Sequence, residues 1–285
     1  MATIRSLTES FGVLKRNPVV FAVGLLYAVI VLPQTAMSLM GIPLVPRLFQ
    51  IVTFFITPFV LAGLLGMTYE GRVRATGFGT FTKIGKKKYV SVLAGNLINF
   101  VITAVFGFVT FIVVVFTIGL TFSAAQSESV LSSIGIVFVA VLAGLGLVYL
   151  LVMFFLQFYA PAIVTDNVGV IEGYRRSVGL VKRNIVQTLG FGVLNLLLGL
   201  LLLLPAIALV VVTIFGAGAL GAGATAGAGS TGASGISGST GGTGLSLVLI
   251  AGIIGYSFIT TVLMTPFRAA FSVSFYDNHR PAQWE

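Results

Sequence analysis

Long apolar runs alternate with short basic segments along this chain. Six runs reach the roughly 20 helical residues that cross the hydrocarbon of a bilayer, and none shows the two-residue alternation of a barrel strand. Because lipid offers the backbone no water to bond, spanning runs of this kind are predicted to be helices. We therefore expect an all-α integral membrane protein with a single six-helix domain over residues 1–285, its spans lying at about 19–40, 48–69, 92–120, 134–163, 186–215 and 245–275.

The connections between these runs predict the orientation of the chain. Fifteen of the sixteen lysines and arginines lie before the first run, after the second and fourth runs, near the end of the sixth run or in the tail, and only Arg47 lies on the other side. Since positively charged loops stay in the cytoplasm, we expect a multi-pass protein of the cell membrane with both termini cytoplasmic. The connection 216–244 has no charged residue and consists mainly of Gly, Ala, Ser and Thr. Such a composition predicts a flexible outer loop.

The segment 170–184 has the pattern of a helix that lies flat on a membrane surface. Read as a helix, it places Val170, Tyr174, Val178 and Val181 on one face and its charged residues opposite. A basic helix of this kind binds in the interface and attracts anionic lipid headgroups. We expect headgroup contacts from the basic residues of this segment and of a similar one near the N-terminus, namely Arg175, Arg176, Lys182, Arg183, Lys15 and Arg16.

An internal repeat is indicated by matching motifs. Residues 10–17 read Ser-Phe-Gly-Val-Leu-Lys-Arg-Asn and residues 177–184 read Ser-Val-Gly-Leu-Val-Lys-Arg-Asn. Thr-Pro-Phe occurs at 57–59 and again at 265–267, in the second and the sixth run. A looser basic segment at 83–89 precedes the third run. The chain is thus interpreted as three hairpins running in parallel, with amphipathic interfacial helices on the cytoplasmic side.

The motif at 177–184, together with Tyr276-Asp277 after the last run, resembles the membrane domain attached to some glycerophosphodiester phosphodiesterases. The chain is also similar to related polytopic membrane proteins of bacteria and archaea whose roles are not established. The resemblance covers nearly the whole chain and implies a polytopic helical fold. In those enzymes catalysis belongs to a separate soluble barrel, so the resemblance implies no catalytic residue here.

Composition narrows the chemistry further. The chain is 57% hydrophobic and 8% charged, against about 25% charged residues in soluble domains. Its net charge of +9 is gathered in clusters between apolar runs, which favours membrane lipids as partners over nucleic acid. There is no cysteine, and the single histidine, His279, lies in the tail. No thiolate site or histidine dyad is available, so we predict a protein that is no enzyme and carries no cofactor and no metal.

Polar residues near or within the runs leave two functions open. Three amides, Asn96, Asn99 and Asn195, either line a path or hydrogen-bond between helices, and interhelical contact is favoured. Three carboxylates at predicted cytoplasmic helix ends, Glu70, Asp166 and Asp277, are expected to pair with nearby arginines. The leading hypothesis is a non-enzymatic protein that organises or senses lipid, or scaffolds partners at the membrane. The alternative is a permease or lipid translocator that works without an intramembrane charge relay.

Overall fold

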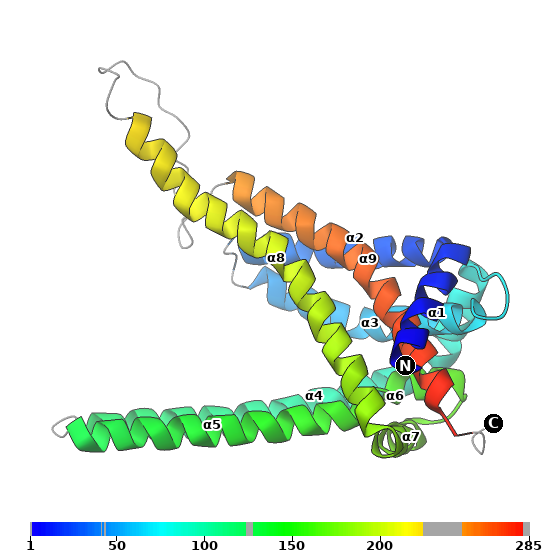
Figure 1. Ribbon diagram of the computed structural model, residues 1–285, viewed down its shortest axis with the longest axis horizontal. Coiled ribbons are helices and arrows are strands. Elements are labelled where there is room, and N and C mark those ends of the chain that lie inside the picture. The colour runs from blue at the N-terminus through cyan, green and yellow to red at the C-terminus, as the bar shows by residue number, and fades with distance from the viewer. Residues whose placement is uncertain (1, 41, 43, 124–127, 225–246, 282–285) are drawn as a thin grey trace.

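The computed structural model describes residues 2–40, 42, 44–123, 128–224 and 247–281 (Figure 1). Within these residues the regular structure is helical and there is no strand. Six stretches are long and apolar enough to cross a membrane, which confirms the predicted number of spans and a multi-pass membrane protein. The helices are α1 (Ala2–Arg16), α2 (Val19–Leu39), α3 (Val45–Glu70), α4 (Phe78–Ser123), α5 (Glu128–Leu156), α6 (Tyr159–Thr165), α7 (Val170–Arg183), α8 (Ile185–Ala224) and α9 (Leu247–His279).

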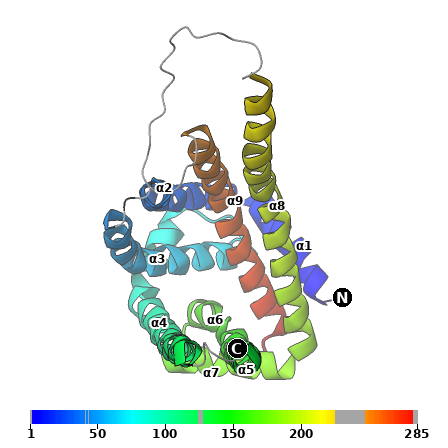
Figure 2. The same cartoon turned by 90° about the vertical axis from the view of Figure 1, so that its left-hand side faces the viewer.

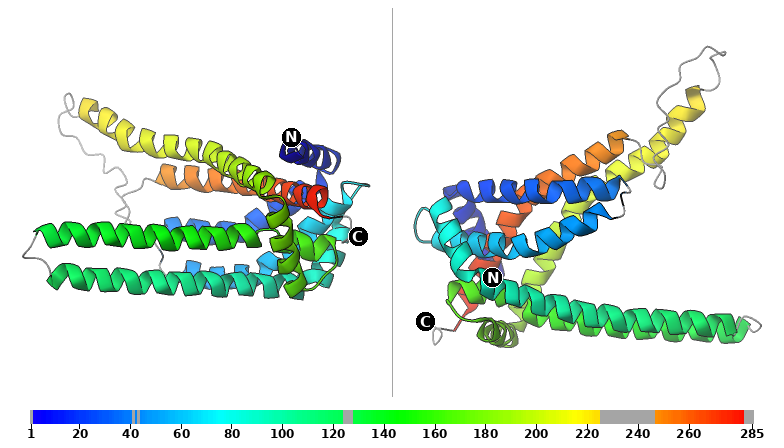
Figure 3. Two further views of the ribbon diagram at one scale, coloured as in Figure 1. Left: turned by 60° about the horizontal axis from the view of Figure 1, so that its bottom comes forward. Right: turned by 180° about the vertical axis from the view of Figure 1, so that it is seen from behind.

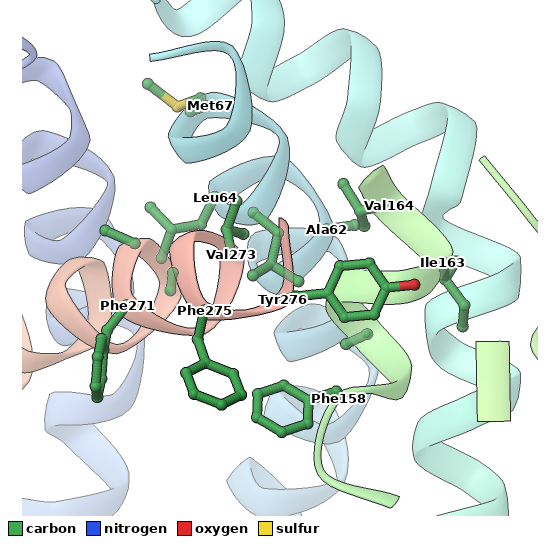
Figure 4. Packing of buried hydrophobic residues seen from close by; sticks show 14 of the residues in the cluster. Ala62, Leu64, Met67, Phe158, Ile163, Val164, Phe271, Val273, Phe275 and Tyr276 are labelled. Atoms are coloured by element: carbon green, nitrogen blue, oxygen red, sulfur yellow. The ribbon is translucent and has the colours of Figure 1, made fainter. Parts of the chain in front are cut away.

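The packed core lies at one end of the molecule. There α3, α6 and α9 contact one another, and Leu64, Ile163, Val273 and Tyr276 are buried between them (Figure 4). Away from this end, α4 and α5 run side by side as a long arm while α8 and α9 diverge from it (Figures 1 and 3). The most apolar stretches of α4 and α5 have no buried residue. Their apolar surface is therefore left for lipid or another hydrophobic partner.

The run predicted as one span over 134–163 is divided into α5 and α6 by a break at Gln157 and Phe158. Pro161 explains the break, because its ring clashes with the carbonyl four residues earlier and it has no N–H to donate. The hydroxyl of Ser177 provides partners for backbone groups at this break. It accepts a hydrogen bond from Phe158 N (3.1 Å) and donates one to the carbonyl of Phe155 (2.7 Å).

The structure describes only part of the connections between α8 and α9 and between α4 and α5. Helix α8 continues to Ala224, into the stretch from 216 that composition predicts as a flexible loop. The rest of that loop, 225–246, lies outside the described residues, as does 124–127 between α4 and α5. Figure 2 shows α8 and α9 on one side of the molecule, α2 and α3 on the other, and the ends of α4 and α5 below them.

Candidate functional site

The two basic segments of the repeat end in the same way. Asn17 follows α1 and Asn184 follows α7. Each donates its backbone N–H to the carbonyl four residues earlier, at 3.0 Å in both cases. Each also donates its side-chain amide to that same carbonyl, Val13 O for Asn17 and Leu180 O for Asn184, at 3.1 Å. The repeated asparagine is therefore a helix cap that satisfies a carbonyl left free by the end of the helix.

The same amides also join the basic segments to the ends of other helices. Asn17 donates to Gly71 O (3.2 Å), directly after α3, and Asn184 donates to His279 O (3.4 Å), the last residue of α9. In addition, Asn17 Oδ1 accepts a hydrogen bond from Thr76 N (3.0 Å). Equivalent residues of the sequence repeat thus make equivalent contacts.

Helix α7 packs with a face that its hydrophobic pattern predicts only in part, since Val181 is buried as expected. Its buried residues are Gly173, Ser177, Leu180 and Val181, whereas Val170, Tyr174 and Val178, predicted for the apolar face, are half-buried. Small residues allow close approach between helices. A Cβ on Gly173 would lie 2.6 Å from Ile163 Cγ1, so the contact with α6 requires glycine.

A buried carboxylate joins α6, α7 and the end of α9. Asp166, directly after α6, has no exposed side-chain surface. Its Oδ2 accepts hydrogen bonds from Arg176 Nη1 (2.6 Å) and Tyr276 OH (2.5 Å), and its Oδ1 accepts one from Arg280 Nη1 (2.8 Å). Figure 4 shows Tyr276 reaching from α9 towards α6. The two arginines and the phenol provide the partners that a buried carboxylate needs.

A second group of charges joins α1 to the end of α9. Arg72, in the turn after α3, donates to Asp277, to Glu9 Oε2 (3.2 Å) and to Asn278 Oδ1 (2.9 Å). Asn278 Nδ2 in turn donates to Glu9 Oε2 (2.7 Å). Arg280 lies 3.0 Å from Asp277 Oδ1 and so connects this group to Asp166. Each of the three carboxylates predicted to pair with a nearby arginine has one as a partner, Glu70 with Arg74, Asp166 with Arg176 and Asp277 with Arg280. Asp166 and Asp277 each pair in addition with a distant arginine, Arg280 and Arg72, which the sequence does not indicate.

The ionisation of these groups follows from their surroundings. Burial lowers the pKa of the Arg280 guanidinium, but its hydrogen bond to Asp166 and the charge of Asp277 outweigh that effect, so the pKa is raised. The pKa of Arg176 is raised in the same way by Asp166 and Glu172, against the opposing effect of burial. Burial raises the pKa of the Tyr174 phenol, which donates to Gly95 O at 2.7 Å. These arginines stay charged and the phenol stays neutral at physiological pH.

The six basic residues predicted to contact headgroups fall into two classes. Arg175 is exposed (83% of its side chain) and lies 3.9 Å from Glu172. Arg176 is only 15% exposed and its guanidinium is bound to Asp166 and Glu172, so it is not available to a headgroup. The other four are exposed and, within the described residues, have no carboxylate within ion-pair distance, namely Lys15, Arg16, Lys182 and Arg183.

The three amides of the spans are half-buried. Asn195 Nδ2 donates to Phe191 O (3.1 Å), within its own helix. Asn99 Oδ1 is buried without a hydrogen-bond partner. The Asn99 side chain, on α4, also interacts with the Tyr159 phenol of α6, which is a contact between helices. Hydroxyl groups make further contacts between helices, as between Thr53 Oγ1 and Gln34 Oε1 (3.2 Å) and between Thr103 Oγ1 and Tyr149 OH (3.4 Å). Sequence reasoning did not identify these hydroxyl contacts, because serine and threonine occur throughout the spans without a distinguishing pattern.

The described residues contain no group of three histidine, cysteine or acidic side chains that would hold a metal ion. The arrangement consists of ion pairs inside the end of the bundle and exposed cations around it. The inner charges hold helices together, and the outer cations are able to attract anions.

Comparison with known proteins identifies a family and no function. No curated protein matches the chain, and no solved structure matches it. Residues 1–279 match the family described as "Domain of unknown function (DUF7847)". The chain therefore belongs to the DUF7847 family.

Proposed function

We propose that this protein is a non-enzymatic, multi-pass protein of the cell membrane whose cytoplasmic face organises or senses anionic lipid. The observation that carries the proposal is the contrast between two sets of cations at the same end of the molecule. The inner arginines are bound by carboxylates, whereas the cations that end α1 and α7 have no such partner among the residues that the structure describes. Near an anionic membrane surface each lysine or arginine contributes about 1 kcal/mol of attraction.

The proposed architecture is three hairpins in parallel, α2–α3, α4–α5/α6 and α8–α9, each preceded by a basic segment. It is supported by where those segments pack. The first turns of α4 lie on α3, with Phe81 against Gly63. Helix α7 lies on α6, with Gly173 against Ile163. Helix α1 lies on α9, with the rings of Phe11 and Phe267 5.1 Å apart. In this arrangement each basic segment packs on the second helix of the preceding hairpin. The segment before the first hairpin, α1, packs on the second helix of the third hairpin, α9.

The orientation with both termini cytoplasmic, and the resemblance to the membrane domain of glycerophosphodiester phosphodiesterases, remain predictions. Both are compatible with a protein that acts through its membrane surface.

The proposal is tested by replacing the five exposed cations among the six predicted to contact headgroups with glutamine, K15Q, R16Q, R175Q, K182Q and R183Q together. Purified protein is exposed to mixed micelles with equal phosphatidylglycerol and phosphatidylcholine, and the bound lipids are counted by native mass spectrometry. The wild-type protein should retain phosphatidylglycerol in excess. The variant should retain the two lipids nearly equally, and added salt should reduce the wild-type preference because exposed charges are screened.

A matched control exchanges lysine and arginine at the same five positions, which keeps every charge. This control should behave as the wild type. If the glutamine variant retains phosphatidylglycerol as strongly as the control does, the exposed cations do not select anionic lipid and the proposal is wrong.

A further inference from the structure

Lys88 is a buried cation with no charged partner in the described part of the chain. It lies on α4 beside the connection between α6 and α7, and only 7% of the residue is exposed. Its ammonium makes one long hydrogen bond, to the carbonyl of Val168 at 3.4 Å. An ammonium has three donors, and a buried charge is normally paired. Lys88 therefore has donors and charge to offer to an anion.

The N-terminus of α7 begins two residues after Val168. Helix α7 has 14 residues, and its N-cap is Gly169, which has no side chain to accept hydrogen bonds from the first turn. The N–H groups of a first turn have no partner within the helix, and the helix dipole adds partial positive charge there. The turn that leads to it contains Asn167 with a left-handed backbone (φ 57°). The ammonium of Lys88, on α4, thus contacts the backbone directly before the N-cap of α7.

We propose that Lys88 and the N-terminus of α7 form a binding site for a phosphate group, supplied by a phospholipid headgroup. Phosphate is the group that helix N-termini bind through backbone N–H groups, and a lysine adds the charge. The proposal deepens the proposed function and rests on it in so far as this end of the protein meets lipid headgroups.

Neighbouring residues favour a lipid as the source of the phosphate. Ile171, in the first turn of α7, is 83% exposed, so an apolar side chain stands beside the proposed site. Lys86 and Lys87, which directly precede Lys88 on α4, are exposed as well and raise the local positive potential. Glu172 is also in this first turn, but its carboxylate is bound by Arg176 Nε at 3.3 Å, which offsets its repulsion of an anion.

The first test compares two adjacent lysines that change the net charge equally. K88Q should weaken the binding of short-chain phosphatidylglycerol to detergent-solubilised protein by about tenfold or more, as expected for losing a charged hydrogen-bond partner. The exposed neighbour, K87Q, should stay within about threefold of wild type, as expected for a screened surface charge. K88R, which keeps the charge, should restore most of the affinity. Equal affinities for K88Q and K87Q would overturn the site.

A second test separates binding from folding at the helix terminus. A Cβ on Gly169 meets no atom within 4 Å, and the N-cap backbone is extended, so G169D is tolerated sterically. Its carboxylate should cap the first turn, raising the Tm of the lipid-free protein while weakening phosphatidylglycerol binding. G169A provides no acceptor and should leave the affinity near that of wild type. A G169D protein that is more stable and still binds lipid as wild type does would also overturn the site.

Inorganic phosphate identifies the source of the ligand. If it binds at the same concentrations as the short-chain lipid, and K88Q abolishes that binding, the site stands with free phosphate as its ligand. If only the lipid binds in a Lys88-dependent manner, the headgroup is the source. The five-cation variant described above keeps Lys88 and should keep this single site while losing its general preference for anionic lipid. The site and the proposed function therefore fail separately.

Discussion

Replacing Asp166 with asparagine tests the view that the inner charges hold the bundle together. The substitution keeps the shape of the side chain and removes its charge. Arg176 and Arg280 would then face a neutral amide while remaining mostly buried, at 15% and 14% exposure of their side chains. Arg280 would keep Asp277 at 3.0 Å, and Arg176 would keep Glu172 at 3.3 Å.

The expected loss of stability follows from this geometry. Breaking a buried ion pair by removing one partner costs about 3–5 kcal/mol, because a charge is left without compensation. Here two cations lose a shared partner and each retains a second carboxylate, so we expect a loss near 3 kcal/mol, the lower end of the range. The hydrogen bond from Tyr276 is retained in a weaker form, since an amide oxygen accepts less strongly than a carboxylate.

The loss is measured as the free energy of unfolding in mixed micelles with increasing dodecyl sulfate. The matched control is Glu172→Gln, which removes a carboxylate bound to the same Arg176 but 43% exposed. It should cost only about 0–1 kcal/mol, as solvent-exposed pairs do. The double variant Asp166→Asn with Arg280→Met should lose less than the sum of the single variants, because it removes one of the cations left unpaired. If Asp166→Asn is as mild as Glu172→Gln, the buried network does not stabilise the fold in the way described.

Two further predictions address the backbone contacts. Asn17→Ala should cost about 2 kcal/mol by leaving Gly71 O and Thr76 N without their partner, and hydrogen exchange at the Thr76 amide should speed up; unchanged exchange would contradict the role of this side chain. Gly63→Ala should cost about 1–3 kcal/mol through overpacking, since a Cβ there would lie 2.4 Å from the ring of Phe81. Gly107→Ala, with open space around its Cβ, should be neutral or stabilising, and similar unfolding midpoints for both glycine variants would refute the packing argument.

The sequence predicts well those features that depend on the length and polarity of a run. Six apolar runs predict six spanning helices because lipid permits few other backbone structures. The repeated Lys-Arg-Asn motif marks the end of both basic helices, where Asn17 and Asn184 cap them. The boundary between α5 and α6 can also be predicted from the sequence, since Pro161 disrupts a regular helix at Gln157.

Other features depend on which helices meet, and the sequence alone does not determine that. Arg72 pairs with Asp277 across 205 residues, a contact that local spacing does not indicate. The hydrophobic pattern predicts only part of the buried face of α7, since Val181 is buried as expected, whereas Gly173 and Ser177 are buried for their small size and hydrogen bonding. Arg175 and Arg176 are adjacent and chemically identical. Arg176 is mostly buried because it binds Asp166, whereas Arg175 is exposed, and the sequence alone does not distinguish them.

The packing of α1 against α9 has a consequence for biosynthesis. Asn278 donates to Glu9 across 269 residues, and Phe11 contacts Phe267. A chain made from its N-terminus forms α1 long before α9 leaves the ribosome. Until then the side of α1 that packs on α9 has no partner in the protein, and the membrane interface is the place where an amphipathic helix rests at lowest free energy. The last helix to be inserted is thus the one that covers this side of the first, so cutting the chain before α9 should leave α1 held only by its contacts with the end of α3 and with α8.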